Sequence, residues 1–240
     1  MNTWLAILIP IFSGIGIIYV ATLIDRSRFQ IRGVVGPYFG ALAVLFGLFA
    51  SLTAHETWQR VGQVNGKVAV EVESLNGIWE VARLLQQGEV VTALIREYVQ
   101  AETADQVAFA ASGVHEMKSA EAIHALYAFS LQGSFMKAEY QAAQGHLLNL
   151  IDNLRNARLE RLELNERHLS STKLLALLLF GALTQAAIAL CHAGNVRASI
   201  ASVMLFSLAS SVSIYFITAL DNPESIQRLI DLSVYETVLE

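Results

Sequence analysis

The sequence has little of two residues that shape many folds, since its 240 residues include one cysteine and three prolines. The single cysteine, Cys191, excludes an internal disulfide framework. Because it lies in an apolar run, it is expected to be a small buried side chain. No proline lies between Pro37 and Pro223. Proline breaks helix interiors, and β-proteins mark their turns with glycine and proline, so this stretch predicts an all-α chain.

Charge is also scarce. Charged residues make up 15% of the chain and hydrophobic residues 54%, and the mean hydropathy is +0.47. Soluble domains carry about 25% charged residues. The net charge of −5 includes no block of like charge, so nucleic-acid binding is not indicated. The apolar residues gather toward both ends of the chain, which predicts an integral membrane protein.

Four apolar stretches are long enough to cross a bilayer, for which a helix needs about 20 residues. No basic residue precedes the first stretch, so a membrane span is a better interpretation of it than a signal peptide. Short loops join the stretches into two hairpins. The predicted spans are residues 3–23, 34–54, 174–190 and 198–220.

The region between the hairpins is charged and amphipathic, which predicts a helical part outside the membrane. Four parts of the chain follow from this: a first hairpin at 1–55, the middle region at 56–172, a second hairpin at 173–221 and a C-terminal tail at 222–240.

The middle region is expected to contain several helices, and no strong break separates the first and the last of them from the adjacent spans. Thr103 and Gln106 have capping-box spacing, so a helix is expected to begin there. In the last helix, apolar residues from Leu147 to Leu164 recur at three- and four-residue steps and predict a packing seam. Arg161 and His168 continue that spacing, so the packing is expected to weaken there or to face water. The expected helices are 56–85, 90–101, 104–112, 119–131 and 134–169.

Positive charges near the spans are more numerous beside the middle region and the tail, which favours the termini and the middle region in the cytoplasm. The dense group Arg26, Arg28 and Arg32 in a short loop favours the opposite orientation. The middle region holds fifteen acidic and ten basic side chains, so a pore that it surrounded would attract cations.

Signals of catalysis are poor. A zinc-protease motif begins at His55 and Glu56, but Gln59 stands where the second histidine is required. Gly14 and Gly16 resemble part of a dinucleotide fingerprint, but Tyr19 replaces the third glycine. In an apolar helix such glycines more simply allow another helix to approach. No enzyme activity is therefore predicted.

The second span has aromatic and leucine side chains together with Gly40 and Gly47. Lipid contact and helix packing would explain this pattern. The functional alternative is a hydrophobic constriction that gates a pore by dewetting. Trp58 fits an interfacial belt on either interpretation.

The fourth span is rich in serine, and Ser207 with Ser211 gives the spacing of closely packed membrane helices. A water-facing stripe is the alternative. Gln185, an isolated amide in the third span, is expected to find a partner on another helix.

Three stretches resemble the bestrophin-like family of bacterial membrane proteins, which is distantly related to the bestrophin channels. The first is VVGPYFGALAVLFGL at 34–48 with ETWQR at 56–60, the second is 71–83 with LIREY at 94–98, and the third is YFITALDNP at 215–223 with SVYE at 233–236. No one motif is highly specific, but their order and the layout of two spans, helices and two spans agree with the family.

The resemblance implies a homo-oligomeric ion channel, pentameric as in bestrophins, in the bacterial inner membrane and without a cofactor. The second span would line the pore, and the middle helices would form a cytosolic vestibule. Glu56 and Trp58 would lie at the membrane exit or pore mouth. By their position before Trp58, the pore-neck candidates are Leu42, Leu45, Phe46 and Phe49.

Bestrophins also bind calcium in an acidic cluster after an Asn-Pro-Phe sequence. Here Glu224 follows Asn222 and Pro223, and the acidic run is missing. Asp221, Glu224 and Asp231 remain as spread-out candidates for cation binding. Because a calcium site needs six or more oxygens, calcium binding stays open.

The channel hypothesis predicts that Phe46→Ala or Phe49→Ala raises conductance or leak. The alternative is a membrane-anchored helical interaction or signalling module that does not conduct. A channel needs a ring with a continuous axial path, whereas a scaffold needs only a dimer or a partner.

Overall fold

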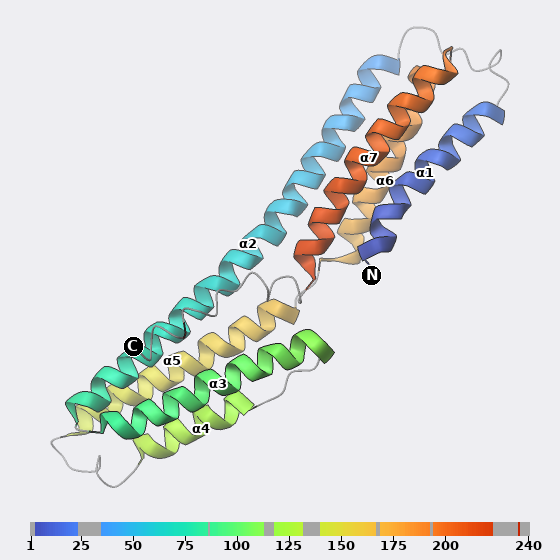
Figure 1. Cartoon of the computed structure of the whole chain (residues 1–240). Helices are drawn as coiled ribbons and strands as arrows, with labels where there is room; N and C mark the ends of the chain where they lie inside the picture. The colour runs from blue at the N-terminus through green and yellow to red at the C-terminus, as the bar shows by residue number, and fades with distance from the viewer. Residues whose placement is uncertain are drawn as a thin grey trace. The chain divides into compact units, whose positions relative to one another are not determined.

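The structure, a computed structural model, describes residues 3–23, 35–85, 87–112, 118–131, 140–166, 169–192, 194–222 and 235. The regular elements within these ranges are helices, and none of the described residues forms a strand (Figure 1). The chain is therefore all-α, as predicted. It divides into two compact units. Residues 1–59 with 168–222 form one, the span unit, and residues 60–167 with 223–240 form the other, the middle unit.

The span unit contains α1 (Thr3–Leu23), the first part of α2 (Val35–Leu84), α6 (Ser171–Cys191) and α7 (Val196–Asp221). Helices α1, α6 and α7 pack against one another (Figure 1). Among the described residues, α2, α6 and α7 are long and apolar enough to cross a membrane, and α1 contributes a shorter apolar segment, Leu8–Thr22. Three candidate spans thus stand where the sequence predicted four.

The ends of the spans differ in two respects from the predictions. Helix α2 does run without interruption from the second span into the middle unit, but α5 and α6 are separate helices. Leu169 and Ser170 are not helical, and both carboxylate oxygens of Asp221 accept a hydrogen bond from the Leu169 N–H, at 2.8 and 2.9 Å. This contact satisfies a donor at the start of α6. The expected burial of Cys191 is also wrong, because its side chain is exposed.

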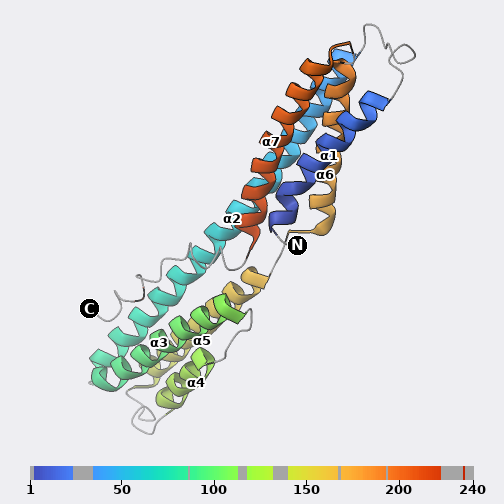
Figure 2. The ribbon, with the colours of Figure 1, turned by 45° about the vertical axis from the view of Figure 1, so that its right-hand side comes forward.

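The middle unit contains the second part of α2 with α3 (Gly88–Ser112), α4 (Lys118–Ser130) and α5 (Gln141–Glu166), which lie side by side in Figure 2. The expected break near Thr103 is absent, since α3 continues through it. Thr103 Oγ1 bonds to the Val99 carbonyl one turn back instead of capping a new helix, and Gln106 Nε2 donates to Glu102.

The core of the middle unit follows the helical period of its sequence. Buried residues recur at steps of three and four on each long helix, so that one face of each turns inward. On α2 the apolar series is Val64, Val68, Val72, Leu75, Ile78 and Ala82, and on α5 it includes Leu147, Ile151 and Leu154. Gly77 leaves room for Leu150, whose methyl carbons lie 3.0 and 3.1 Å from where a Cβ would be. Buried charged residues interrupt the inward faces of α2, α3 and α5.

Candidate functional site

The pore-neck candidates of α2 do not share one environment. Phe46 is 7% exposed, and its ring packs edge-on against Phe206 of α7 at 5.3 Å between centroids. It also lies over Gly181 of α6, where a Cβ would come within 3.5 Å of the ring. Phe46 therefore holds α2 against α6 and α7 inside one protomer.

The other three candidates spread around the helix. Phe49 is half-buried and tilts against Phe180 of α6 at 5.7 Å between centroids, and Leu42 is also half-buried. Leu45, in contrast, is 46% exposed. Of the four residues, only Leu45 points clearly away from the helices of its own protomer.

The outer face of the first part of α2 is apolar and is exposed among the residues that the structure describes. Leu45, Leu48 and Leu52 are exposed on it, and a Cβ added at Gly40 or Gly47 would meet nothing within 4 Å. On the opposite face, Thr53 and Thr57 are buried and bond to backbone carbonyls of their own helix. Helix α2 thus packs inside the protomer with one side only.

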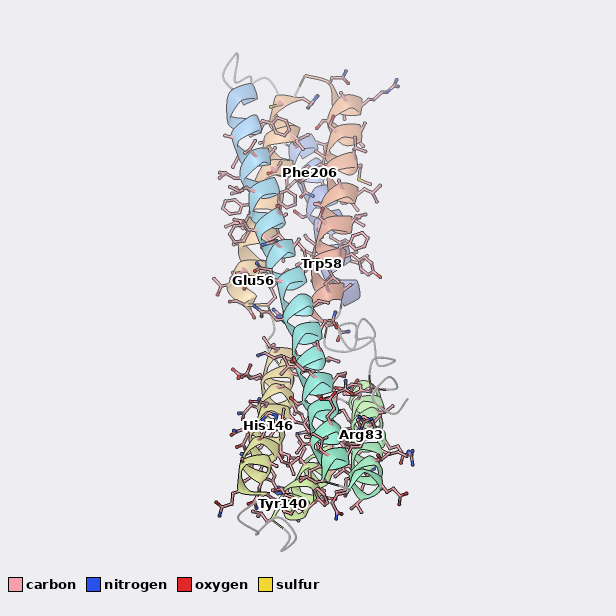
Figure 3. All side chains as sticks on the ribbon, turned by 90° about the vertical axis from the view of Figure 1, so that its left-hand side faces the viewer. Glu56, Trp58, Arg83, Tyr140, His146 and Phe206 are labelled. Atoms are coloured by element: carbon pink, nitrogen blue, oxygen red, sulfur yellow. The ribbon has the colours of Figure 1, made fainter. Side chains whose placement is uncertain are left out.

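The two residues predicted at the membrane exit lie on different sides of α2 (Figure 3). Glu56 is paired with Lys173 of α6, whose Nζ lies 2.6 and 2.5 Å from the two carboxylate oxygens. Trp58 is 65% exposed, as an interfacial tryptophan would be. The charge of Glu56 is therefore balanced by a neighbouring helix of the same protomer.

The candidate cation-binding residues are only partly described. Asp221 lies at the end of α7, and both of its carboxylate oxygens accept a hydrogen bond from the Leu169 N–H. Glu224 and Asp231 lie outside the described residues. Within the described ranges, no group of three or more His, Cys, Asp or Glu side chains could hold a metal ion.

Gln185 is the polar centre of the span unit. Its Nε2 donates to the Pro10 carbonyl at 2.8 Å and to Ser207 Oγ at 2.9 Å, and its Oε1 accepts from Ser13 Oγ at 2.8 Å. The amide therefore connects α1, α6 and α7, as expected of a lone intramembrane amide. Because its donors and acceptor are paired within the protomer, it has no need of water.

The serines of α7 support close packing rather than a wet stripe. Ser207, Ser210 and Ser211 are buried, and Ser207 and Ser210 donate to carbonyls of their own helix. A Cβ at Gly14 of α1 would come within 2.3 Å of Ser207 Oγ. Small residues on both helices thus bring α1 and α7 close together.

The middle unit contains a buried charge cluster that was not predicted. We use this term for Glu71 of α2, Glu102 and Asp105 of α3, and Arg158 and Arg161 of α5. Arg161 is fully buried and donates from Nε to Glu71 Oε1 at 2.7 Å and from Nη2 to Glu102 Oε1. The expectation that packing weakens at Arg161 is wrong, since the guanidinium is the centre of the cluster.

A second layer of the cluster ties α3 and α5 to α4. Arg158 Nε lies 3.3 Å from Glu102 Oε2 and donates to Ser119 Oγ at 2.9 Å. Asp105 Oδ2 accepts from the Ser119 backbone N–H at 2.9 Å and from its Oγ at 2.6 Å. Asp105 thus accepts a hydrogen bond from a backbone N–H in the first turn of α4, where the N–H groups have no partner within the helix and a negative charge is favourable.

The electrostatics of the two glutamates differ. Burial would raise the pKa of Glu102, but Arg161, the hydrogen bond from Gln106 and Arg158 together hold that pKa at about 2. For Glu71, burial outweighs the single arginine and raises the pKa above its usual value. Arg161 stays charged, because the two carboxylates raise its pKa.

The missed cluster had a signal in the sequence. Glu71, Glu102 and Arg161 each take the next three- or four-residue step of an apolar series on their helix, where a core residue is expected. Charges of opposite sign at such positions on different helices indicate a buried ion pair rather than a weak seam.

A comparison with protein families identifies the family of this chain. The model of the bestrophin-like domain matches residues 7–223. The chain belongs to the bestrophin-like family. This confirms the resemblance inferred from the second span, the middle helices and the end of the last span. As a bestrophin-like chain with apolar helices it is a membrane protein with a channel kind of function. No curated protein matches the chain, and neither does a solved structure.

Proposed function

We propose that this chain is the subunit of a homo-oligomeric channel that lets ions pass passively through a central pore lined by α2. Family membership supports the class of function. In the proposal, five copies surround the pore, as in the bestrophins, and the middle unit lies in the cytoplasm. The protein lies in the bacterial inner membrane, and conduction needs no cofactor.

The observation that carries the proposal is the one-sided packing of α2. Its inner face is held by Phe46 and Phe49, while its outer face exposes leucines beside two glycines with open space. Glycine in a helix interior is less stable than alanine by about 1 kcal/mol. Lipid does not require glycine, whereas a closely approaching helix does.

In the proposed subunit, α1 also crosses the membrane, so that there are four spans in all. It has 21 residues, and such a helix is roughly 30 Å long, which matches the hydrocarbon layer. The Gln185 hydrogen bonds and the Gly14 contact support this placement, because they join α1 to α6 and α7 along apolar helices.

The test of the proposal is ion flux into liposomes that contain the purified protein. Among the four neck candidates, Leu45 has the outward position, so we expect Leu45→Ala to widen a hydrophobic constriction and raise the flux several-fold. Leu205→Ala is the matched control, because Leu205 is an exposed leucine on α7 at 71%. It should leave the flux unchanged.

Phe46→Ala and Phe49→Ala remain neck variants by position, but their contacts predict a second effect. Removing either ring leaves a void between α2 and its neighbours, so these variants should also lower the unfolding temperature. Absence of flux in the wild type and in all three variants would reject conduction and favour a non-conducting interaction module.

A further inference from the structure

Lys173 and Glu56 form an ion pair at one end of the span unit. Lys173 lies in the first turn of α6, and its Nζ donates to both carboxylate oxygens of Glu56 on α2, at 2.6 and 2.5 Å. The two side chains are 42% and 49% exposed, so water and ions reach the pair. Glu56 is therefore a surface charge that is balanced by a residue of another helix.

The stability of the fold does not explain this pair. An exposed ion pair contributes little to stability. In addition, the first turn of a helix favours an anion, because the N-terminal end of the helix dipole is positive. Lys173 therefore opposes the dipole of its own helix. The main physical effect of the lysine is on the electric charge at this end of α2.

Glu56 also has a particular position on α2. It comes eleven residues after Leu45 and four after Leu52, and both leucines are exposed. Eleven residues are about three whole turns at 3.6 residues per turn, or about 16 Å along the axis. Glu56 thus lies on the same line along the helix as Leu45, the neck candidate that points away from its own protomer. Where that line faces a pore, Glu56 stands on the same wall beyond the neck.

We propose that Lys173 is a specificity-determining residue of the channel, which cancels the charge of Glu56 at the pore mouth and so sets the balance between cations and anions. This inference rests on the proposed function. In a ring of five subunits, the paired residues add no net charge to the mouth. Without the lysine, five carboxylates form a ring of negative charge that attracts cations and repels anions. Without Glu56, five ammonium groups do the reverse.

Reversal potentials of the full-length protein in planar bilayers, measured under a potassium chloride gradient, test this role. Lys173→Met keeps a long unbranched side chain and removes the charge, so we expect the ratio of potassium to chloride permeability to rise several-fold. Glu56→Gln should lower the same ratio. The double variant has neither charge and should return to the wild-type ratio. The shifts should shrink in molar salt, because the Debye length falls from about 10 Å at 0.1 M to about 3 Å at 1 M.

Arg197→Met is the matched control. Arg197 is an exposed cation in the first turn of α7. Because a short connection joins α6 to α7, α7 begins at the end of the span unit opposite to Lys173 (Figure 1). The variant removes one positive charge from a helix that does not line the proposed pore, so the permeability ratio should stay at the wild-type value.

The signs of the shifts separate this role from a structural one. A pair that only held α2 against α6 would be broken by either variant, so Lys173→Met and Glu56→Gln would change the ratio in the same direction or leave it unchanged. Either result overturns the role of Lys173 while the channel function stands. If neither the wild type nor the variants conduct, the proposed function fails, and the role of Lys173 fails with it.

Discussion

At the scale of single residues, Arg161 pairs with two carboxylates whose pKa values shift in opposite directions. Glu102 has a second arginine, Arg158, and an amide donor, and its pKa falls to about 2. Glu71 has one arginine and two tyrosine hydroxyls, and burial raises its pKa. The number of cations within reach, together with burial, thus decides in which direction the pKa of each carboxylate shifts in the interior of the middle unit.

This difference predicts how acid destabilises the middle unit. Since the folded pKa of Glu102 is below its unfolded value, its charge stabilises the fold above about pH 4.5, and this contribution is lost as the pH falls toward 2. The contribution of this charge to the free energy of unfolding at neutral pH is on the order of 3 kcal/mol. Unfolding temperatures of Glu102→Gln measured between pH 7 and pH 3 should be lower at neutral pH and should change less with pH than those of the wild type.

Glu160→Gln is the control for that titration, because Glu160 pairs with Lys67 on the surface. Exposed ion pairs contribute little, so its unfolding temperatures should follow the wild type at every pH. If Glu102→Gln did the same, the stabilising role of the Glu102 charge would be refuted.

Residue-scale predictions from the sequence were sound where the residue type alone required a partner and failed where the identity of the partners had to be known. Gln185 needed a partner on another helix, and it has partners on two. Packing was expected to weaken at Arg161, because within its own helix it is a charged residue at a position where the spacing calls for an apolar one. Its burial depends on Glu71 and Glu102, which lie 90 and 59 residues away in the sequence.

At the scale of helices, Gly14 lies where α1 and α7 approach each other closely. A Cβ at Gly14 would lie 2.3 Å from Ser207 Oγ, whereas one at Gly16 would meet nothing within 4 Å. Gly14→Ala should therefore push α1 away from α7, disturb the Gln185 hydrogen bonds and lower the unfolding temperature in detergent. Gly16→Ala should preserve or raise it, since alanine favours helix by about 1 kcal/mol. Equal unfolding temperatures for the two variants would contradict the close contact.

Helix positions were predictable from hydropathy and period, but some helix ends were not. The long α2 and both helices of the second hairpin match the expected stretches. Between α5 and α6, the Leu169 N–H donates to Asp221, a residue 52 positions away, and no local pattern indicated this contact. The false break near Thr103 came from a local capping pattern, which the packing of α3 against the charge cluster overrides.

At the scale of the whole molecule, the order of apolar and charged stretches indicated a membrane protein, and the order of its motifs indicated the family. Neither reveals assembly. The shape of one protomer does bear on it, since the outer face of α2 combines exposed leucines with Gly40 and Gly47. Exposed leucines suit lipid, but glycines with open space beside them are typical of a surface that another membrane helix approaches closely.

The last prediction concerns that assembly. Single-particle imaging of the purified protein in nanodiscs should show a closed ring of subunits, five in number, with the outer face of α2 toward a central path. A closed ring forms when a head-to-tail contact between copies repeats around an axis and closes, and the same face of every copy then turns toward that axis. Gly47→Leu should break the ring into smaller species, because it fills the space that a neighbouring helix requires. Gly145→Leu is the control, since Gly145 in the middle unit also has open space around it. A dimer with a packed axis, insensitive to Gly47→Leu, would remove the pore and leave the middle unit as a platform for a partner protein.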